Sequence, residues 1–117
     1  MKEQLKKLPE TIKEMRLQLL IDASMITSLQ KRIKEWEAAE MQSITDITDN
    51  GKAVFSNDAK RQAELLKRKV SNSVIKSTED SLTKMQLKYE ESKIELMFHV
   101  DMQENYRAIA RLGGGEQ

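Results

Sequence analysis

The chain has no cysteine, one proline and four glycines among its 117 residues. The lack of cysteine excludes disulfide bonds and thiolate metal sites, which suits a reducing compartment. Only 4% of the residues are aromatic, so few large side chains are present to fill a globular core. No apolar run approaches the roughly 18 residues of a membrane span, and the first residues lack a signal-peptide stretch. The sequence therefore predicts a cytoplasmic protein with no membrane partner.

Charged residues make up 33% of the chain, yet the net charge is only +1. No global field therefore attracts nucleic acid or an anionic membrane. Abundant charge with few aromatics is typical either of disorder or of long helices, and helical periodicity distinguishes the two.

An apolar seam with coiled-coil spacing runs from Leu5 to Glu40. Alternating steps of three and four residues meet nine apolar residues in eleven positions. Such a pattern over five heptads predicts a coiled-coil helix. Pro9 is tolerable only in a first turn, so we expect the continuous helix to start near residues 8–10. The predicted seam residues are Leu8, Ile12, Met15, Leu19, Ile26, Leu29, Ile33 and Trp36.

Asp22 interrupts this seam. It is either a polar residue that fixes the register of the coiled coil or a solvated residue at a point where the seam drifts outward. We favour the solvated interpretation because it requires no special environment.

A short β-hairpin is predicted after the first helix. Asn50-Gly51 is the strongest short hairpin signal, because both central residues of a type I′ turn need positive φ. A two-residue loop there pairs Asp49 with Lys52, and Ile47 with Val54. The hairpin is therefore expected at about residues 44–55.

A second helical segment follows over about residues 57–112. Its N-cap is expected within Ser56-Asn57-Asp58. The spacing of its apolar stripe slips between residues 71 and 78, where Ser77 with Asp80 resembles a capping box. Either one locally unwound helix or two helices meeting there is expected. The stripe residues are Ala59, Ala63, Leu66, Val70 and Val74, and then Leu82, Met85 and Tyr89.

These elements predict an all-α fold, a long antiparallel helical hairpin of the coiled-coil type with a β-hairpin at the connection. Residues 1–112 form a single domain in this prediction, with the first helix at about 9–42. The glycines from Gly113 onward end the last helix, and residues 113–117 are expected to be a disordered tail. Two such rods leave apolar surface uncovered, so the chain is expected to form a homo-oligomer.

No residue pattern predicts catalysis. His99 is the only histidine, and with Glu95 one turn before it could supply half of a metal site. A structural metal needs about four protein ligands, so an ordinary histidine is the favoured interpretation. Glu90 and Glu91 lie among lysines on a charged face, and no glycine-rich phosphate loop exists. We expect no enzyme activity, no cofactor, no metal and no small-molecule substrate.

One segment carries a local excess of positive charge. Residues 56–76 contain six basic and two acidic residues, whereas residues 77–117 contain five basic and eight acidic residues. The basic segment could contact phosphates of DNA, but the interpretation we favour is that it pairs with acidic faces of a neighbouring subunit. The candidate nucleic-acid-binding residues are Lys60, Arg61, Lys67, Arg68 and Lys69.

The order helix, hairpin, helix resembles the β-type subunit of prefoldin, in which two coiled-coil helices flank a single β-hairpin used for assembly. This resemblance is architectural and covers the whole chain. It implies a molecular chaperone that holds unfolded clients.

A second resemblance is local. Residues 51–65 fit the pattern G-K-x-x-F-S-N-x-x-x-R-x-x-E-L, and Ile94-Glu95-Leu96 and residues 106–112 resemble the closing helix of the same proteins. These are small coiled-coil proteins of phages and integrative elements, and the match covers roughly residues 47–112. The resemblance implies a neighbourhood of replication and recombination genes rather than an activity.

Together these observations predict a non-enzymatic, oligomeric coiled-coil binding protein of a phage or mobile element. It would assist DNA recombination or replication, or counter a host defence, in the host cytoplasm. Its partners would be further copies of itself and either DNA or a host or phage protein. The alternatives are a prefoldin-like chaperone and a purely structural spacer.

Overall fold

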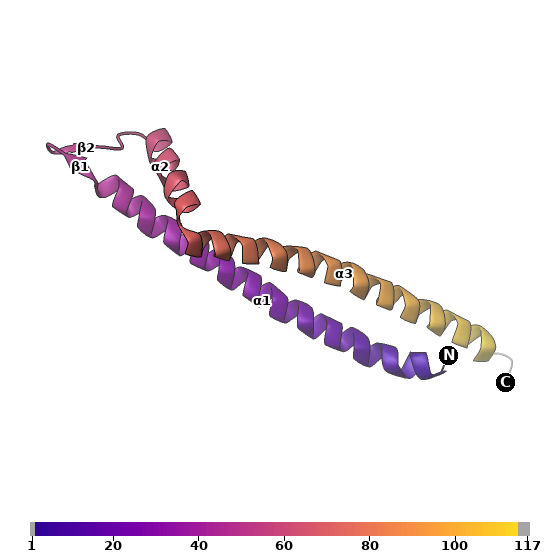
Figure 1. Cartoon of the computed structure of the whole chain (residues 1–117). Coiled ribbons are helices and arrows are strands. Elements are labelled where there is room, and N and C mark those ends of the chain that lie inside the picture. Colours follow the sequence, from indigo (N-terminus) through magenta and orange to yellow (C-terminus); the bar gives the residue numbers. More distant parts are fainter. Residues whose placement is uncertain (1, 115–117) are drawn as a thin grey trace. The chain divides into compact units, whose positions relative to one another are not determined.

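The computed structural model describes residues 2–114, and their side chains from residue 6 to residue 113. Helix α1 (Lys2–Asp46) leads into strands β1 (Thr48–Asp49) and β2 (Lys52–Ala53), followed by helices α2 (Asp58–Ser71) and α3 (Ser73–Gly114) (Figure 1). Of the described residues, 89% are helical. The predicted all-α fold with a β-hairpin between helices is confirmed.

The chain divides into two compact units. Unit 1 comprises Met1–Met25 and Met85–Gln117, and unit 2 comprises Ile26–Lys84. In unit 1, Asp22 of α1 lies near Lys88 of α3. In unit 2, Glu37 of α1 contacts Lys69 of α2. Each unit is therefore held by contacts between segments far apart in the sequence.

Helix α1 buries its predicted seam. Leu8, Ile12 and Ile33 are buried, and the remaining seam residues between residues 15 and 40, apart from Asp22, are half-buried. The predicted start near residues 8–10 is wrong, because the helix begins at Lys2 and contains Pro9. Pro9 lies in the second turn, where its missing N–H removes a single hydrogen bond near the frayed helix end.

Asp22 is the least exposed polar side chain described, with 1% of its surface accessible. The favoured interpretation of a solvated residue is therefore wrong. The seam does not drift outward at this point, and the carboxylate lies in it. Its Oδ1 accepts a hydrogen bond of 3.0 Å from Gln18 Nε2.

The hairpin has the predicted register. Asp49 pairs with Lys52 and Thr48 with Ala53, and the amide of Val54 donates to the carbonyl oxygen of Ile47. Both turn residues have positive φ, 51° at Asn50 and 77° at Gly51, as the type I′ turn requires.

The second helical segment is divided at a single residue, Asn72. Its backbone N–H donates to Lys69 O and ends α2, while its side-chain Oδ1 accepts from the amides of Val74 and Ile75 at 3.0 Å and starts α3. The alternative of two helices meeting in this region is the one observed. The capping box suggested at Ser77 and Asp80 is wrong, because both residues lie within α3.

Helix α2 presents its predicted apolar stripe to solvent rather than to α1. Leu66 and Val70 are 63–66% exposed, and the alanines of the stripe are exposed as well, whereas Val74, the last residue of the predicted stripe, lies in α3. The opposite face is turned inward, with Leu65 buried. The N-cap of α2 is Asn57, whose Oδ1 accepts a hydrogen bond of 2.8 Å from the amide of Lys60.

Helix α3 also buries a seam with coiled-coil spacing, but several of its members are polar. Ile75 is buried and the other seam residues are half-buried. The helix extends through Gly113 and Gly114, so these two residues do not belong to a disordered tail. The rest of the predicted tail, 115–117, lies outside the described residues. The seam positions of α3 are Ile75, Thr78, Leu82, Met85, Tyr89, Ser92, Leu96, His99, Gln103 and Tyr106.

Candidate binding surfaces

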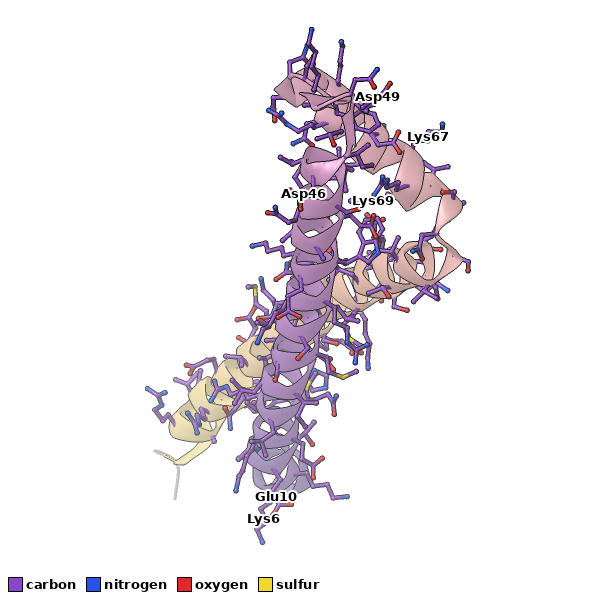
Figure 2. The ribbon with its side chains drawn as sticks, turned by 90° about the vertical axis from the view of Figure 1, so that its left-hand side faces the viewer. Lys6, Glu10, Asp46, Asp49, Lys67 and Lys69 are labelled. Carbon is purple, nitrogen blue, oxygen red and sulfur yellow. The ribbon has the colours of Figure 1, made fainter. Side chains whose placement is uncertain are left out.

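The five basic residues predicted to contact nucleic acid separate into two groups on α2. Arg68 and Lys69 face the end of α1, whereas Lys60 and Lys67 are exposed. Figure 2 shows Lys69 beside α1 and Lys67 on the far side of α2. Arg61 is half-buried, and its Nη1 donates to the carbonyl oxygen of Phe55 at 3.3 Å. The structure therefore does not bring all five cations onto one surface.

Arg68 bridges α2 and α1. Its Nη1 lies 2.9 Å from Oε2 of Glu40, and its Nε lies 3.1 Å from Oε1 of Glu64. The hydrogen bond to Glu40, followed by the one to Glu64, raises the pKa of Arg68 above its ordinary value. The same guanidinium group reaches Ser43 Oγ at 3.4 Å.

Lys69 joins three helices of unit 2. Its Nζ lies 2.8 Å from Oε1 of Glu37 in α1 and 3.6 Å from Oε2 of Glu79 in α3. The hydrogen bond to Glu37 raises the pKa of Lys69, against the opposing effect of partial burial. Glu40, Glu64, Glu37 and Glu79 of the same chain therefore pair with Arg68 and Lys69, while pairing of the basic segment with a neighbouring subunit stays a prediction.

Lys60 and Lys67 remain available for a partner. They lie two turns apart along α2 and line a shallow groove whose apolar wall is formed by Val54, Phe55 and Ala63. The Nζ of Lys60 contacts Ser56 Oγ at 3.4 Å, an exposed and weak contact. This part of unit 2 thus combines an apolar surface with two exposed positive charges.

The outer face of α3 in unit 1 has the opposite charge, and the sequence analysis did not single it out. Leu87, Ile94 and Phe98 are 60–71% exposed and recur at positions that share one helix face. Glu91 and Asp101 lie on the same face, and both are exposed. The signal was present in the sequence as a second apolar stripe offset from the seam.

Unit 1 also contains a groove lined by both α1 and α3. Its floor includes Ile12, Leu17 and Leu20, and its rim carries basic side chains from both helices. Sequence reasoning missed this grouping because it depends on the register between α1 and α3. The basic rim residues are Lys13, Arg16 and Arg107.

His99 lies in the seam of α3 with its Nδ1 2.8 Å from the backbone carbonyl oxygen of Glu95, and its ring meets Phe98 edge to face.

No group of three His, Cys, Asp or Glu side chains within the described residues is placed to hold a metal ion. Across the same part of the chain, no helix is long and apolar enough to cross a membrane.

Comparisons with known proteins identify no relative, so the function of this chain is inferred from the surfaces described above. No protein-family model, curated protein or solved structure matches this chain.

Proposed function

We propose that this chain is a non-enzymatic coiled-coil binding protein that acts as a homo-oligomer. The observation that carries the proposal is the distribution of apolar side chains. Among the described residues, six large apolar side chains are buried, whereas fourteen are 44–79% exposed. Exposed apolar surface that recurs along helix faces supports protein association rather than an isolated monomer.

Analytical ultracentrifugation of the full chain at micromolar concentration tests this proposal. The expected result is a dimer or larger species that dissociates on dilution, with a helical circular dichroism spectrum. A chain that stays monomeric up to about 100 μM would contradict the proposal, because a homo-oligomer with a dissociation constant of about 10 μM is mostly associated at that concentration.

DNA binding is a second candidate, and the exposure of Lys60 and Lys67 favours it. Because Arg68 and Lys69 are paired with carboxylates, at most a few phosphate contacts remain on α2. Each contact lowers the logarithm of the affinity by about 0.7–0.9 per logarithmic unit of salt, so the total salt dependence should be shallow. The phage or mobile-element origin belongs to this candidate through the resemblance of residues 51–65.

A gel shift at low salt separates the two candidates. If the chain binds DNA, a protein–DNA complex should form at about 10 μM protein. The complex should be lost in the variant Lys60→Glu/Lys67→Glu. The charge-matched control Lys31→Glu/Lys34→Glu changes two exposed lysines of α1 and should leave the complex intact. The absence of any complex would remove the DNA candidate and leave protein association.

A further inference from the structure

We infer that the outer stripe of α2 in one copy of the chain binds the outer stripe of α3 in another copy. The α2 stripe consists of Ala59, Ala63, Leu66 and Val70, and the α3 stripe consists of Leu87, Glu91, Ile94, Phe98 and Asp101. This inference rests on the proposed homo-oligomer and names the two surfaces that form it.

The α2 stripe has the layout of a coiled-coil seam with basic edges. With Ala63 and Val70 at a positions and Leu66 at a d position, Lys60 and Lys67 both fall at e. Residues at e flank the seam and select the partner by charge. Two copies of this stripe packed on each other would add lysines to lysines, so self-pairing is disfavoured.

The α3 stripe has acidic groups both within it and beside it. Glu91 and Asp101 interrupt the apolar positions, and Glu95 follows Ile94 at the edge. All three carboxylates are exposed, and none forms an ion pair within residues 6–113. A partner that covers Glu91 must supply a positive charge, because a buried unpaired carboxylate is strongly unfavourable. Two α3 stripes offer each other only Lys88, which lies one heptad before Glu95 on the same edge and 3.9 Å from the carboxylate of Asp22, so carboxylates outnumber cations on this face.

Lysines at the edge of one stripe and carboxylates in the other are therefore complementary. Lys60 and Lys67 are separated by about 10 Å along α2, and Glu91 and Asp101 by about 15 Å along α3, at 1.5 Å per residue. Both distances are shorter than the length of a helix pair of three to four turns, so one such contact can include both lysines and both carboxylates. The contact joins two different surfaces, so it either occurs twice in a two-fold pair or links copies head to tail into a ring or an open chain.

The apolar area available agrees with a reversible contact. Six large apolar side chains, including Met97 at the edge of the α3 stripe, are 60–71% exposed on the two faces. At about 100 Å² of apolar surface for each, this leaves roughly 400 Å². For an interface about 57% apolar, the contact buries roughly 700 Å² in total. Areas of this size are typical of weak, concentration-dependent complexes, in which the charges decide the partner.

A charge-swap experiment on the full chain tests the inference. The first variant is Lys60→Glu/Lys67→Glu, and the second is Glu91→Lys/Glu95→Lys. Each variant alone places like charges at the contact, so self-association measured by sedimentation velocity should weaken at least about tenfold. An equimolar mixture restores opposite charges at every contact between the two variants, and its association should return to within about twofold of the wild type. The control Lys31→Glu/Lys34→Glu should associate like the wild type.

Each result decides the matter. If either swapped variant alone self-associates like the wild type, or if the mixture fails to recover, the inference is wrong while the homo-oligomer stands. If the wild-type chain is monomeric, the proposed function itself fails. All four swapped side chains are exposed, and circular dichroism verifies that the variants remain helical. A salt titration of the wild type gives a second measurement that needs no variant: added NaCl should weaken the association, and an increase in association with salt would overturn the inference.

Discussion

Lys88 Nζ lies 3.9 Å from Oδ1 of Asp22, a carboxylate with only 1% of its surface exposed. The second oxygen of this carboxylate, Oδ2, accepts no hydrogen bond from any described residue. The lysine is 57% exposed and only partly compensates the charge. Asp22 is thus a polar residue within an apolar seam, an arrangement that favours one register of a coiled coil at a cost in stability.

Replacement of Asp22 by leucine should therefore stabilise the protein. Removal of a buried, incompletely paired charge in favour of an apolar side chain of similar size stabilises by about 1–4 kcal/mol. Urea unfolding followed by circular dichroism measures the change. Lys88→Met is the matched comparison, because it removes the cation and leaves the buried carboxylate, and it should destabilise. A less stable Asp22→Leu protein would show that the carboxylate has a partner worth more than its desolvation.

Ile33→Asp should unfold or dissociate the helices of unit 2. Ile33 is 8% exposed in the seam of α1, and an unpaired charge at such a site costs several kcal/mol. Thermal denaturation measures the loss. Lys34→Asp, one residue further on the exposed face, is the control and should change the melting temperature little. Equal effects of the two substitutions would contradict the seam.

Gly51→Val should destabilise the hairpin through the backbone alone. Gly51 has a φ of 77°, and a side chain built on it would meet no atom within 4 Å. The cost is therefore conformational, about 1–2 kcal/mol. Gly51→Asn is the control, because asparagine adopts positive φ more readily. Chemical-shift changes confined to residues 47–54 report the effect, and equal stability of the Val and Asn variants would contradict it.

Lys69 should give the protein a stability component that disappears at alkaline pH. Its folded-state pKa is raised above the ordinary lysine value of 10.5. Its contribution is therefore complete below that pH and is lost as pH rises through the folded pKa. The wild type should exceed Lys69→Met by about 0.5–1 kcal/mol at neutral pH, and the difference should be lost as the pH rises through the folded-state pKa of Lys69. Lys69→Arg should remain more stable than Lys69→Met over that alkaline range, because the guanidinium stays charged. A difference between the wild type and Lys69→Met that is independent of pH would contradict the role of the ion pairs.

Local sequence signals were sufficient to predict the hairpin and α1 except for its start, whereas the slip in spacing located the break in the second segment but left one unwound helix or two helices as alternatives. The α1 seam follows heptad spacing over many turns, and Asn50-Gly51 permits few other conformations. Packing of α2 was not predictable in the same way, since its most apolar stripe faces solvent. Glu37 and Glu40 on α1 attract Lys69 and Arg68 to the inner face, and these ion pairs become visible only when the two helices are aligned.

The seam of α3 illustrates a related limit. Thr78, Ser92, His99 and Gln103 occupy positions that the coiled-coil spacing assigns to the interior, while Leu87 and Ile94 lie outside. The apolar stripe predicted from the sequence therefore met the seam only at Leu82, Met85 and Tyr89 and did not extend to its polar members. Of the candidate site, the sequence identified the basic residues but not their division into paired and exposed groups, which depends on contacts across more than twenty residues.

The boundary between α2 and α3 rests on one residue, Asn72. Asn72 ends one helix with its backbone and begins the next with its side chain, so no loop residues separate them. If that side chain is lost, the amides of Val74 and Ile75 must bond either to water or to carbonyls of the preceding turn, and the second arrangement is the bonding pattern of an uninterrupted helix. Arg68 and Lys69 would then leave Glu40 and Glu37. The Asn72 side chain therefore determines how much positive charge α2 exposes. With the break at Asn72 present, only Lys60 and Lys67 are exposed and unpaired with carboxylates, and without it Arg68 and Lys69 would be exposed as well.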